Sequence, residues 1–291
     1  MRDSRTSLRA RFAVACSGNS TVNNASVNFQ NALDALASVL FPAPCRICAA
    51  PLLRASRIPI CDACLGAFER VVSPMCAHCG RPFASSAMAQ LERPLCRLCR
   101  ADFYAFDRAR SFAIYNDALS GAILMMKYDE VTRLGHWFAD RLFELISAEP
   151  GEWRADAVVP VPLHVSRLRE RGYNQAELIA RPLAKLLKLP LRSRLLVRTV
   201  PRPAQQVLSR TEHWKSVRGA YETHNRSRVD KLRLLLVDDV MTTGATLDAC
   251  SRGLKRAGAT IVLGLTVGRV VPGWYDRGPA ARAAANRTIG G

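Results

Sequence analysis

The chain has 291 residues, of which 49% are hydrophobic and 23% are charged, a composition typical of folded globular proteins. Its longest uncharged apolar stretches fall short of the ~18 residues that span a bilayer, so we expect no membrane span. Lys and Arg number 42 against 24 Asp and Glu, and the resulting net charge of +18 favours a polyanionic partner such as nucleic acid, a nucleotide or a phosphorylated metabolite. A codon bias toward arginine would explain the same charge without any ligand.

The N-terminal region predicts little folded structure before the first cysteine. Residues 1–27 are rich in Ser, Asn and Arg and have no apolar period, which predicts a disordered extension. Apolar residues then recur at helical spacing from Val27 to Leu40, and Pro42 ends the pattern. The apolar patch at 12–16 is too short for the core of a signal peptide, so we expect the protein in the cytoplasm.

Eight of the ten cysteines form four Cys-x-x-Cys pairs. Such a turn places two thiolates on one side of a metal ion, and two turns complete a tetrahedral shell that has no open position for water. The pattern therefore predicts two structural zinc sites, in a helix-plus-zinc module over 28–100. Successive pairs and interleaved pairs both satisfy the spacing. The predicted ligands are Cys45, Cys48, Cys61, Cys64, Cys76, Cys79, Cys96 and Cys99.

An iron–sulfur cluster and a redox dithiol are the alternatives for the cysteine pairs. A redox dithiol needs only one pair, and disulfide frameworks belong to small secreted chains. His78 lies inside the third pair, where we expect it to face solvent. Arg46, Arg97 and Arg100 flank the pairs and are either DNA contacts or a solvated surface. Cys250 lies outside the pairs and is expected in the core.

From residue 101 onward the sequence alternates between strands and helices, which predicts an α/β domain over 101–271 with a mostly parallel sheet. Pro182 is expected to kink or interrupt the helix that contains it. Ligands are expected at the carboxyl ends of the strands, and residues 272–291 are expected to form a flexible tail. The predicted strands are 109–115, 155–162, 234–237 and 260–267, and the predicted helices are 117–126, 132–146, 174–187 and 247–257.

The most informative segment runs from Leu234 to Leu247. Its apolar strand ends at two adjacent acids, Asp238 and Asp239, and a turn of small and hydroxyl residues leads into a helix. Backbone N–H groups of residues 242–246 and the helix N-terminus attract a phosphate. The two carboxylates would repel that phosphate unless they bind sugar hydroxyls or a divalent cation. A ribose phosphate is therefore the ligand that we expect.

This segment resembles the ribose-5-phosphate signature of type I phosphoribosyltransferases, in which an apolar strand is followed by Asp-Asp and then Thr-Thr-Gly-x-Thr. The resemblance implies a type I phosphoribosyltransferase-like fold. It also implies that Asp238 and Asp239 bind the ribose hydroxyls of phosphoribosyl pyrophosphate, which these proteins bind with Mg²⁺. The residues implied to bind the 5-phosphate are Thr242, Thr243, Gly244, Ala245 and Thr246.

Residues upstream of this segment indicate one particular family among the phosphoribosyltransferase-like proteins. Val159-Pro160-Val161-Pro162-Leu163 and the following arginine-rich segment resemble the ComF family of competence-associated phosphoribosyltransferase-like proteins, which also carry an N-terminal cysteine-rich zinc module. The resemblance places the pyrophosphate loop at 159–163 and makes Arg167 and Arg171 candidates for diphosphate contacts, to which a guanidinium is well suited. A basic surface helix turn is the alternative for these arginines.

A third element of the family is a mobile loop with a glutamine, followed by an Arg, an Asn and the ending Gly-Ala-Phe. Gln205 matches the glutamine, and Gly219-Ala220-Tyr221 matches the ending. His213 and Ser216 stand where the family pattern has Arg and Asn, a departure that bears on whether the loop closes on diphosphate. The candidate catalytic residues are therefore Asp238, Asp239, Arg167, Arg171 and Gln205.

Two functions agree with these residues. The first is Mg²⁺-dependent transfer of the phosphoribosyl group to an unidentified acceptor, in which the protein positions the reactants and stabilises the departing diphosphate. The second is a non-catalytic scaffold for DNA uptake and recombination, which binds single-stranded DNA or a helicase through the zinc module and the basic surface. In the second case the sugar-phosphate site senses a ligand or is vestigial.

Overall fold

A computed structural model describes residues 43–52, 57–201, 210–223 and 229–274. Within this part of the chain, no helix combines the length and the apolar character that crossing a membrane requires. Four expectations lie outside the described residues, wholly or in part: the extension over 1–27, the helix that follows it, Gln205, and the flexible tail over 272–291, of which only 272–274 are described.

The chain divides into two compact units. One unit contains the residues up to Glu69 together with Asn116–Leu134, and the other contains Arg70–Tyr115 and the chain from Gly135 onward. The two halves of the cysteine region therefore lie in different units. The domain limits over 1–27, 28–100, 101–271 and 272–291 stay a prediction.

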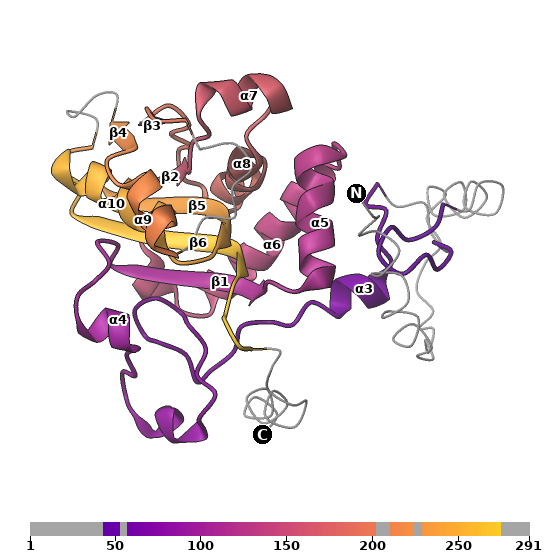
Figure 1. Cartoon of the computed structure of the whole chain (residues 1–291), viewed down its shortest axis with the longest axis horizontal. Coiled ribbons are helices and arrows are strands. Elements are labelled where there is room, and N and C mark those ends of the chain that lie inside the picture. Colours follow the sequence, from indigo (N-terminus) through magenta and orange to yellow (C-terminus); the bar gives the residue numbers. More distant parts are fainter. Residues whose placement is uncertain (1–42, 53–56, 202–209, 224–228, 275–291) are drawn as a thin grey trace. The chain divides into compact units, whose positions relative to one another are not determined.

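A four-stranded parallel sheet, in the order β1-β6-β5-β2, forms the centre of the second unit (Figure 1). This sheet confirms the predicted α/β class and places the carboxyl ends of β2 and β5 side by side. All four strands are almost entirely buried, as is typical of parallel strands covered on both faces. The strands are β1 (Arg108–Ile114), β2 (Ala157–Pro160), β5 (Arg233–Met241) and β6 (Ile261–Arg269).

Strand β5 extends beyond its predicted end at Val237. Its ladder with β6 continues through Asp238, opposite Thr266, to Met241, opposite Arg269. The two acids therefore lie inside a paired strand, and the turn begins at Thr242. The sequence prediction ended the strand at the last apolar residue, but the neighbouring strand supplies hydrogen-bond partners beyond that point.

Helices cover the sheet where the apolar stripes predicted them. Helix α8 (Gln175–Leu187) packs against β2 and β5, and α10 (Ala245–Arg256) packs against β5 and β6. Helix α8 continues through Pro182, so the predicted interruption does not occur. Its buried stripe, which includes Ile179 and Leu183, packs in the core, and this tertiary packing outweighs the hydrogen bond that proline removes.

The remaining elements are short, apart from α5 (Asp117–Tyr128) and α6 (Arg133–Ser147), both of which the sequence predicted. The first unit contains α3 (Asp62–Gly66) and α5 (Asp117–Tyr128), and the side chain of Asn116 caps α5 by accepting from the N–H of Leu119. The second unit adds the elements that sequence periodicity missed: η1 (Ser86–Gln90), α4 (Arg97–Arg100), η2 (Pro150–Trp153), α7 (Val165–Arg171), α9 (Arg210–Val217) and the antiparallel pair β3 (Leu196–Arg198) and β4 (Tyr221–Thr223).

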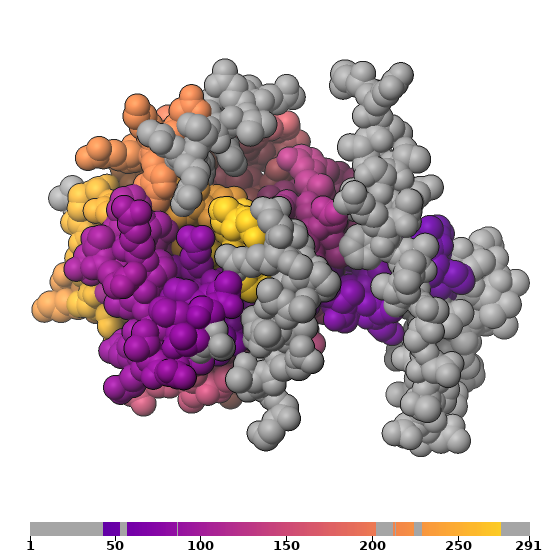
Figure 2. Space-filling model, turned by 60° about the horizontal axis from the view of Figure 1, so that its bottom comes forward, coloured from indigo at the N-terminus to yellow at the C-terminus, as the bar shows by residue number. Residues whose placement is uncertain are grey.

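The segment that carries the last four ligand cysteines belongs to the core of the second unit. Cys76, Cys79, Cys96 and Cys99 form one hydrophobic cluster with residues of β2, β5, β6 and α10. The backbone N–H of Ala109, on β1, donates to the carbonyl of His78 at 2.8 Å. The purple segment around α4 accordingly lies next to the yellow end of β6 in the space-filling view (Figure 2).

Candidate functional site

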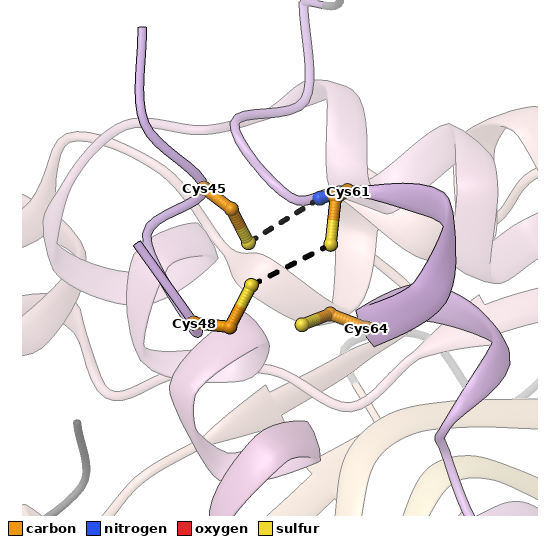
Figure 3. A group of neighbouring side chains, drawn as sticks. All are labelled: Cys45, Cys48, Cys61 and Cys64. Atoms are coloured by element: carbon orange, nitrogen blue, oxygen red, sulfur yellow. Dashed lines mark hydrogen bonds between the residues drawn. The ribbon is translucent and has the colours of Figure 1, made fainter. Parts of the chain in front are cut away.

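The first cysteine group consists of Cys45 and Cys48 from a loop, Cys61 at the start of α3 and Cys64 within α3 (Figure 3). The four sulfur atoms lie within 4.8 Å of one another, and those of Cys48 and Cys61 are 3.7 Å apart. A tetrahedral zinc ion with bonds of about 2.3 Å places its sulfur ligands about 3.8 Å apart. Burial raises the pKa of the Cys45 thiol, but hydrogen bonds from the backbone of Cys48, Cys61 and Ile47 outweigh burial and lower it to about 7.

The second group repeats this geometry with Cys76, Cys79, Cys96 and Cys99. Its sulfur atoms also lie within 4.8 Å of one another, and those of Cys79 and Cys96 are 3.8 Å apart. In both groups the backbone N–H of the third cysteine donates to the sulfur of the first at 3.3 Å. Four convergent thiols at tetrahedral spacing are the donor set of a structural zinc site, so both groups fit one zinc ion each.

The structure decides between the two pairings that the spacing allowed. The first Cys-x-x-Cys pair joins the second, and the third joins the fourth, so the sites are successive rather than interleaved. His78 is not a member of either group, as expected, but it does not face solvent. It is half-buried, its Nε2 lies 2.6 Å from the carbonyl oxygen of Phe106, and its ring packs against the ring of Phe106. The prediction of a solvent-facing ring was therefore wrong, because β1 runs directly beside this cysteine turn.

The predicted phosphate loop connects β5 to α10. Gly244 is the N-cap of α10 with φ +83°, a backbone conformation that favours glycine. A Cβ at this position would lie 2.8 Å from the side chain of Met241 and 2.8 Å from the ring of Tyr104. The Tyr104 hydroxyl donates to the carbonyl of Thr243 at 2.9 Å, and burial raises the pKa of this phenol, which keeps the donor protonated. The loop is thus a tightly packed turn at the N-terminus of a twelve-residue helix.

The two acids are buried in β5, where Val240 and Met241 separate them from this loop. The exposed fraction is 7% for Asp238 and 6% for Asp239, and the N–H of Asp239 donates to a carboxylate oxygen of Asp238 at 2.9 Å. Within the loop, Thr242 is exposed, Thr243 and Thr246 are half-buried, and Gly244 and Ala245 are buried. The loop thus presents one exposed and two half-buried hydroxyl groups close in the chain to two buried carboxylates.

The Val-Pro-Val-Pro segment lies beside β5. Pro160 is in register with Val237, and the N–H of Val161 donates to the carbonyl of Val237 at 2.9 Å. Asn174 caps α8 by accepting from the N–H of Ala176, and its amide donates to the carbonyl of Val161 at 3.0 Å. The parallel sheet therefore brings two sequence motifs that are more than seventy residues apart to one edge.

Two predicted diphosphate contacts lie on α7, which follows this segment. Arg167 pairs with Glu170 one turn later, and Arg171 donates to the amide oxygen of the buried Gln175. Cys250 is fully buried in α10, and burial raises the pKa of its thiol, so it is a core residue, as expected. The roles of these arginines, of the paired acids and of the loop stay predictions.

Sequence reasoning missed Tyr104 and two buried arginines, Arg110 and Arg269. Arg110 lies on β1 with 8% of its surface exposed, and Arg269 ends β6 with 4% exposed. A charged residue inside or at the end of an otherwise apolar strand was the available signal, since arginine is almost never buried without a partner. Nothing in the sequence marked Tyr104.

Comparisons with known proteins find relatives of the cysteine-rich region and of most of the chain. The family described as double zinc ribbon domain matches residues 36–100. DNA utilization protein YhgH of Salmonella typhimurium is 29% identical over 76% of this chain and 94% of the relative. Competence protein F of Haemophilus influenzae is 27% identical over 67% of this chain and 85% of the relative. Competence protein ComFC of Bacillus subtilis is 27% identical over 68% of this chain and 79% of the relative.

Solved structures that align with the chain include two enzymes. A glutamine phosphoribosylpyrophosphate amidotransferase from B. subtilis is 24% identical over 45% of this chain, with a TM-score of 0.31, and the match covers 26% of that enzyme's chain. A purine phosphoribosyltransferase from Pyrococcus horikoshii is 17% identical over 46% of this chain and 84% of that chain, with a TM-score of 0.28.

The chain is thus an α/β protein with a parallel sheet, preceded by a double zinc ribbon whose two four-cysteine groups fit zinc. Within this class it is a homologue of competence protein F, ComFC and YhgH over most of its length. The predicted resemblance to the ComF family is therefore confirmed.

Proposed function

We propose that the chain binds phosphoribosyl pyrophosphate with Mg²⁺ at the carboxyl ends of β2 and β5 and transfers the phosphoribosyl group to an acceptor. The observation that carries this proposal is the position of Asp238 and Asp239. They are buried near the end of β5, whose following loop leads into a glycine-capped helix, and Val159 and Pro160 lie at the end of the neighbouring strand β2. A phosphate at the helix N-terminus and a ribose over the acids fit this arrangement.

Each part of the ligand has a protein partner in this proposal. The loop residues 242–246 hold the 5-phosphate through backbone N–H groups and hydroxyls, and Asp238 and Asp239 accept the ribose hydroxyls. The backbone of the 159–163 segment, with Arg167 and Arg171, holds the diphosphate, and Gln205 is the proposed contact from the following loop. Mg²⁺ supplies positive charge to the diphosphate when it is bound with the substrate.

The transfer does not require a covalent bond between the protein and the substrate. The bond between the ribose C1 and the diphosphate oxygen breaks, the diphosphate leaves with the electron pair, and the acceptor's lone pair forms the new bond to C1. Positioning of the two reactants and stabilisation of the departing charge account for the acceleration. No side chain acts as a covalent nucleophile.

Titration calorimetry of zinc-replete protein with phosphoribosyl pyrophosphate and Mg²⁺ tests the proposal. We expect heat of binding in the unmodified protein and its loss in Asp238→Asn/Asp239→Asn. Asp140→Asn, the same chemical change at an exposed position of α6, is the matched control and should bind like the unmodified protein. Absence of binding in folded protein with both zinc ions would contradict the proposal.

A binding role on single-stranded DNA is the second candidate, and the names of the relatives favour it, since they refer to competence and DNA utilization. The net charge of +18 and the exposed Arg97 and Arg100 on α4 supply a basic surface. Here the sugar-phosphate site senses a ligand or is vestigial, and a helicase is the proposed protein partner.

Fluorescence anisotropy with a labelled oligonucleotide tests the DNA role. Affinity should fall as salt rises, and Arg97→Ala/Arg100→Ala should weaken binding and reduce the salt slope by about 1.4. No affinity at low salt would exclude the DNA role. We place either activity in the cytoplasm, because four-thiolate zinc sites need reduced cysteines.

A further inference from the structure

Arg110 and Arg269 are both buried in the second unit without a carboxylate partner. Within the described residues, neither guanidinium takes part in any ion pair. Removing a cation from water costs several kcal/mol unless a negative charge or a full set of acceptors compensates it. Backbone carbonyls accept from both guanidiniums, and any negative charge that compensates them comes from a group other than a carboxylate.

Both guanidiniums donate to the turn that carries Cys76 and Cys79. The Nη1 atom of Arg269 donates to the carbonyl of Cys79 at 2.6 Å, and its Nη2 lies 3.5 Å from the Cys79 sulfur. The Nη1 atom of Arg110 donates to the carbonyl of Ala77 at 3.1 Å. The two arginines thus approach one cysteine turn from two adjacent strands, β1 and β6.

Charge explains why two arginines are needed. Four thiolates around one Zn²⁺ carry a net charge of −2, which two guanidiniums neutralise. The four cysteines of this group are all buried, so water does not screen that charge. We propose that Arg110 and Arg269 are the counter-ions of the second zinc–thiolate site, and that Arg269 with Tyr104 ties this site to the loop between β5 and α10.

The tie to the loop rests on three contacts. Arg269 Nη1 lies 2.9 Å from the sulfur of Met241, the residue opposite it in the β5–β6 ladder. The N–H of Val270 donates to the carbonyl of Met241 at 3.0 Å, and the Tyr104 hydroxyl donates to the carbonyl of Thr243. A cavity of about 210 Å³ adjoins these contacts, and its lining includes Cys79, Cys96, Tyr104, Thr242, Thr243 and Arg269.

It follows that the second zinc site positions the loop. Arg269 keeps its buried place because the thiolates need its charge, and it holds Met241 at the start of the loop. Tyr104, which stacks on Phe106 with ring centroids 4.7 Å apart, holds Thr243 at the other side. The consequence for phosphate affinity rests on the proposed function, whereas the counter-ion role does not.

Release of zinc to a chelator tests the counter-ion role without any sugar ligand. Arg269→Gln keeps a hydrogen-bond donor but removes the charge, and we expect one of the two zinc ions to leave at least about tenfold faster. Arg110→Gln should accelerate the release of the same zinc ion. Arg269→Lys loses the second contact but keeps the charge, so it should release zinc more slowly than Arg269→Gln. Arg93→Gln, at an exposed position three residues before the ligand Cys96, is the matched control and should leave zinc release unchanged.

Cobalt substitution supplies a second measurement on the same variants. Loss of the Arg269 contact to the Cys79 sulfur should shift the thiolate-to-cobalt absorption of one site only. The counter-ion role is overturned if both Gln variants release zinc like the unmodified protein, or if Arg269→Lys releases it as fast as Arg269→Gln. Should Arg269→Gln not fold, Arg110→Gln and Arg269→Lys decide in the same way.

Calorimetry with phosphoribosyl pyrophosphate and Mg²⁺ tests the tie to the loop. Tyr104→Phe removes the donor to Thr243, and we expect about fivefold weaker binding with an unchanged zinc content. Tyr128→Phe, at an exposed position of α5, is the control. Unchanged affinity in both Tyr104→Phe and Arg269→Gln would overturn the tie. If the unmodified protein binds nothing, the proposed function fails, while the zinc-release comparison still decides the counter-ion role.

Discussion

The two cysteine sites begin with the same local structure. In each, the N–H of the first cysteine donates to the carbonyl five residues later, and the residue four positions after that cysteine has positive φ, Ala49 at +62° and Gly80 at +66°. Their surroundings differ. Cys48 and Cys61 of the first site are partly exposed, whereas all four cysteines of the second site are buried against the sheet. The same sequence motif therefore forms a partly exposed site in one unit and a site within the hydrophobic core in the other.

The largest expected difference between the two sites is in the unfolding free energy that is lost when one site can no longer bind zinc. Cys76→Ser/Cys79→Ser removes ligands from the buried site and leaves two arginines uncompensated, so we expect a loss of about 5 kcal/mol or more in the unfolding free energy. Cys45→Ser/Cys48→Ser should leave the unfolding of the sheet largely unchanged. Zinc analysis should give about one ion per chain in both variants, and thermal unfolding measures the difference. Equal destabilisation would contradict the comparison.

The residue at positive φ in each turn offers a sharper contrast. A Cβ on Gly80 would lie 2.7 Å from the carbonyl oxygen of Ala109 on β1, so Gly80→Ala should destabilise the protein by roughly 2–4 kcal/mol. Ala49 already carries a Cβ in the same conformation, and Ala49→Gly should change stability by less than about 1 kcal/mol. Denaturant unfolding of both variants checks this, and a harmless Gly80→Ala would show that the second turn is not packed on β1.

The loop beside the second site permits a similar test. Gly244→Ala combines positive φ with a close approach to Met241 and Tyr104, and we expect a loss of roughly 2–3 kcal/mol together with loss of ligand binding. Gly172 has nearly the same φ, +82°, but a Cβ there meets nothing within 4 Å. Gly172→Ala should therefore cost only about 1 kcal/mol. Equal effects of the two substitutions on unfolding would mean that the Tyr104 contact does not constrain the loop.

Cys250 provides the smallest expected effect and separates ligand cysteines from a core cysteine. Cys250→Ala should cost about 1 kcal/mol and leave the zinc content unchanged. Because burial raises the pKa of the Cys250 thiol above that in the unfolded chain, the folded form stays protonated, and stability should fall as pH rises above the ordinary thiol range. That fall should be smaller in Cys250→Ala. A change of zinc content in this variant would contradict the assignment to the core.

Much of this protein was predictable from local patterns. The apolar periods placed α5, α6, α8 and α10 within a few residues, and the β–α alternation indicated the parallel sheet. Both signals arise from burial of one face of a regular element, which a sequence records directly. The sequence did not predict the short helices α7 and α9 or the β3–β4 pair. A helix of fewer than three turns, or a strand pair of fewer than four residue pairs, is too short for a hydrophobic periodicity to be recognised.

The sequence by itself determined the longer helices and the strands of the main sheet, the eight clustered cysteines and the segment from Asp238 to Thr246, because each depends on residue types at fixed local spacing. Only the tertiary structure decided that the cysteine pairs are successive, that the two acids lie inside a paired strand, and that Arg110 and Arg269 converge on one cysteine turn. These features depend on contacts between strands far apart in the chain. Local spacing carries no record of which strands become neighbours, and it is the neighbouring strand that supplies the partner for a buried charge.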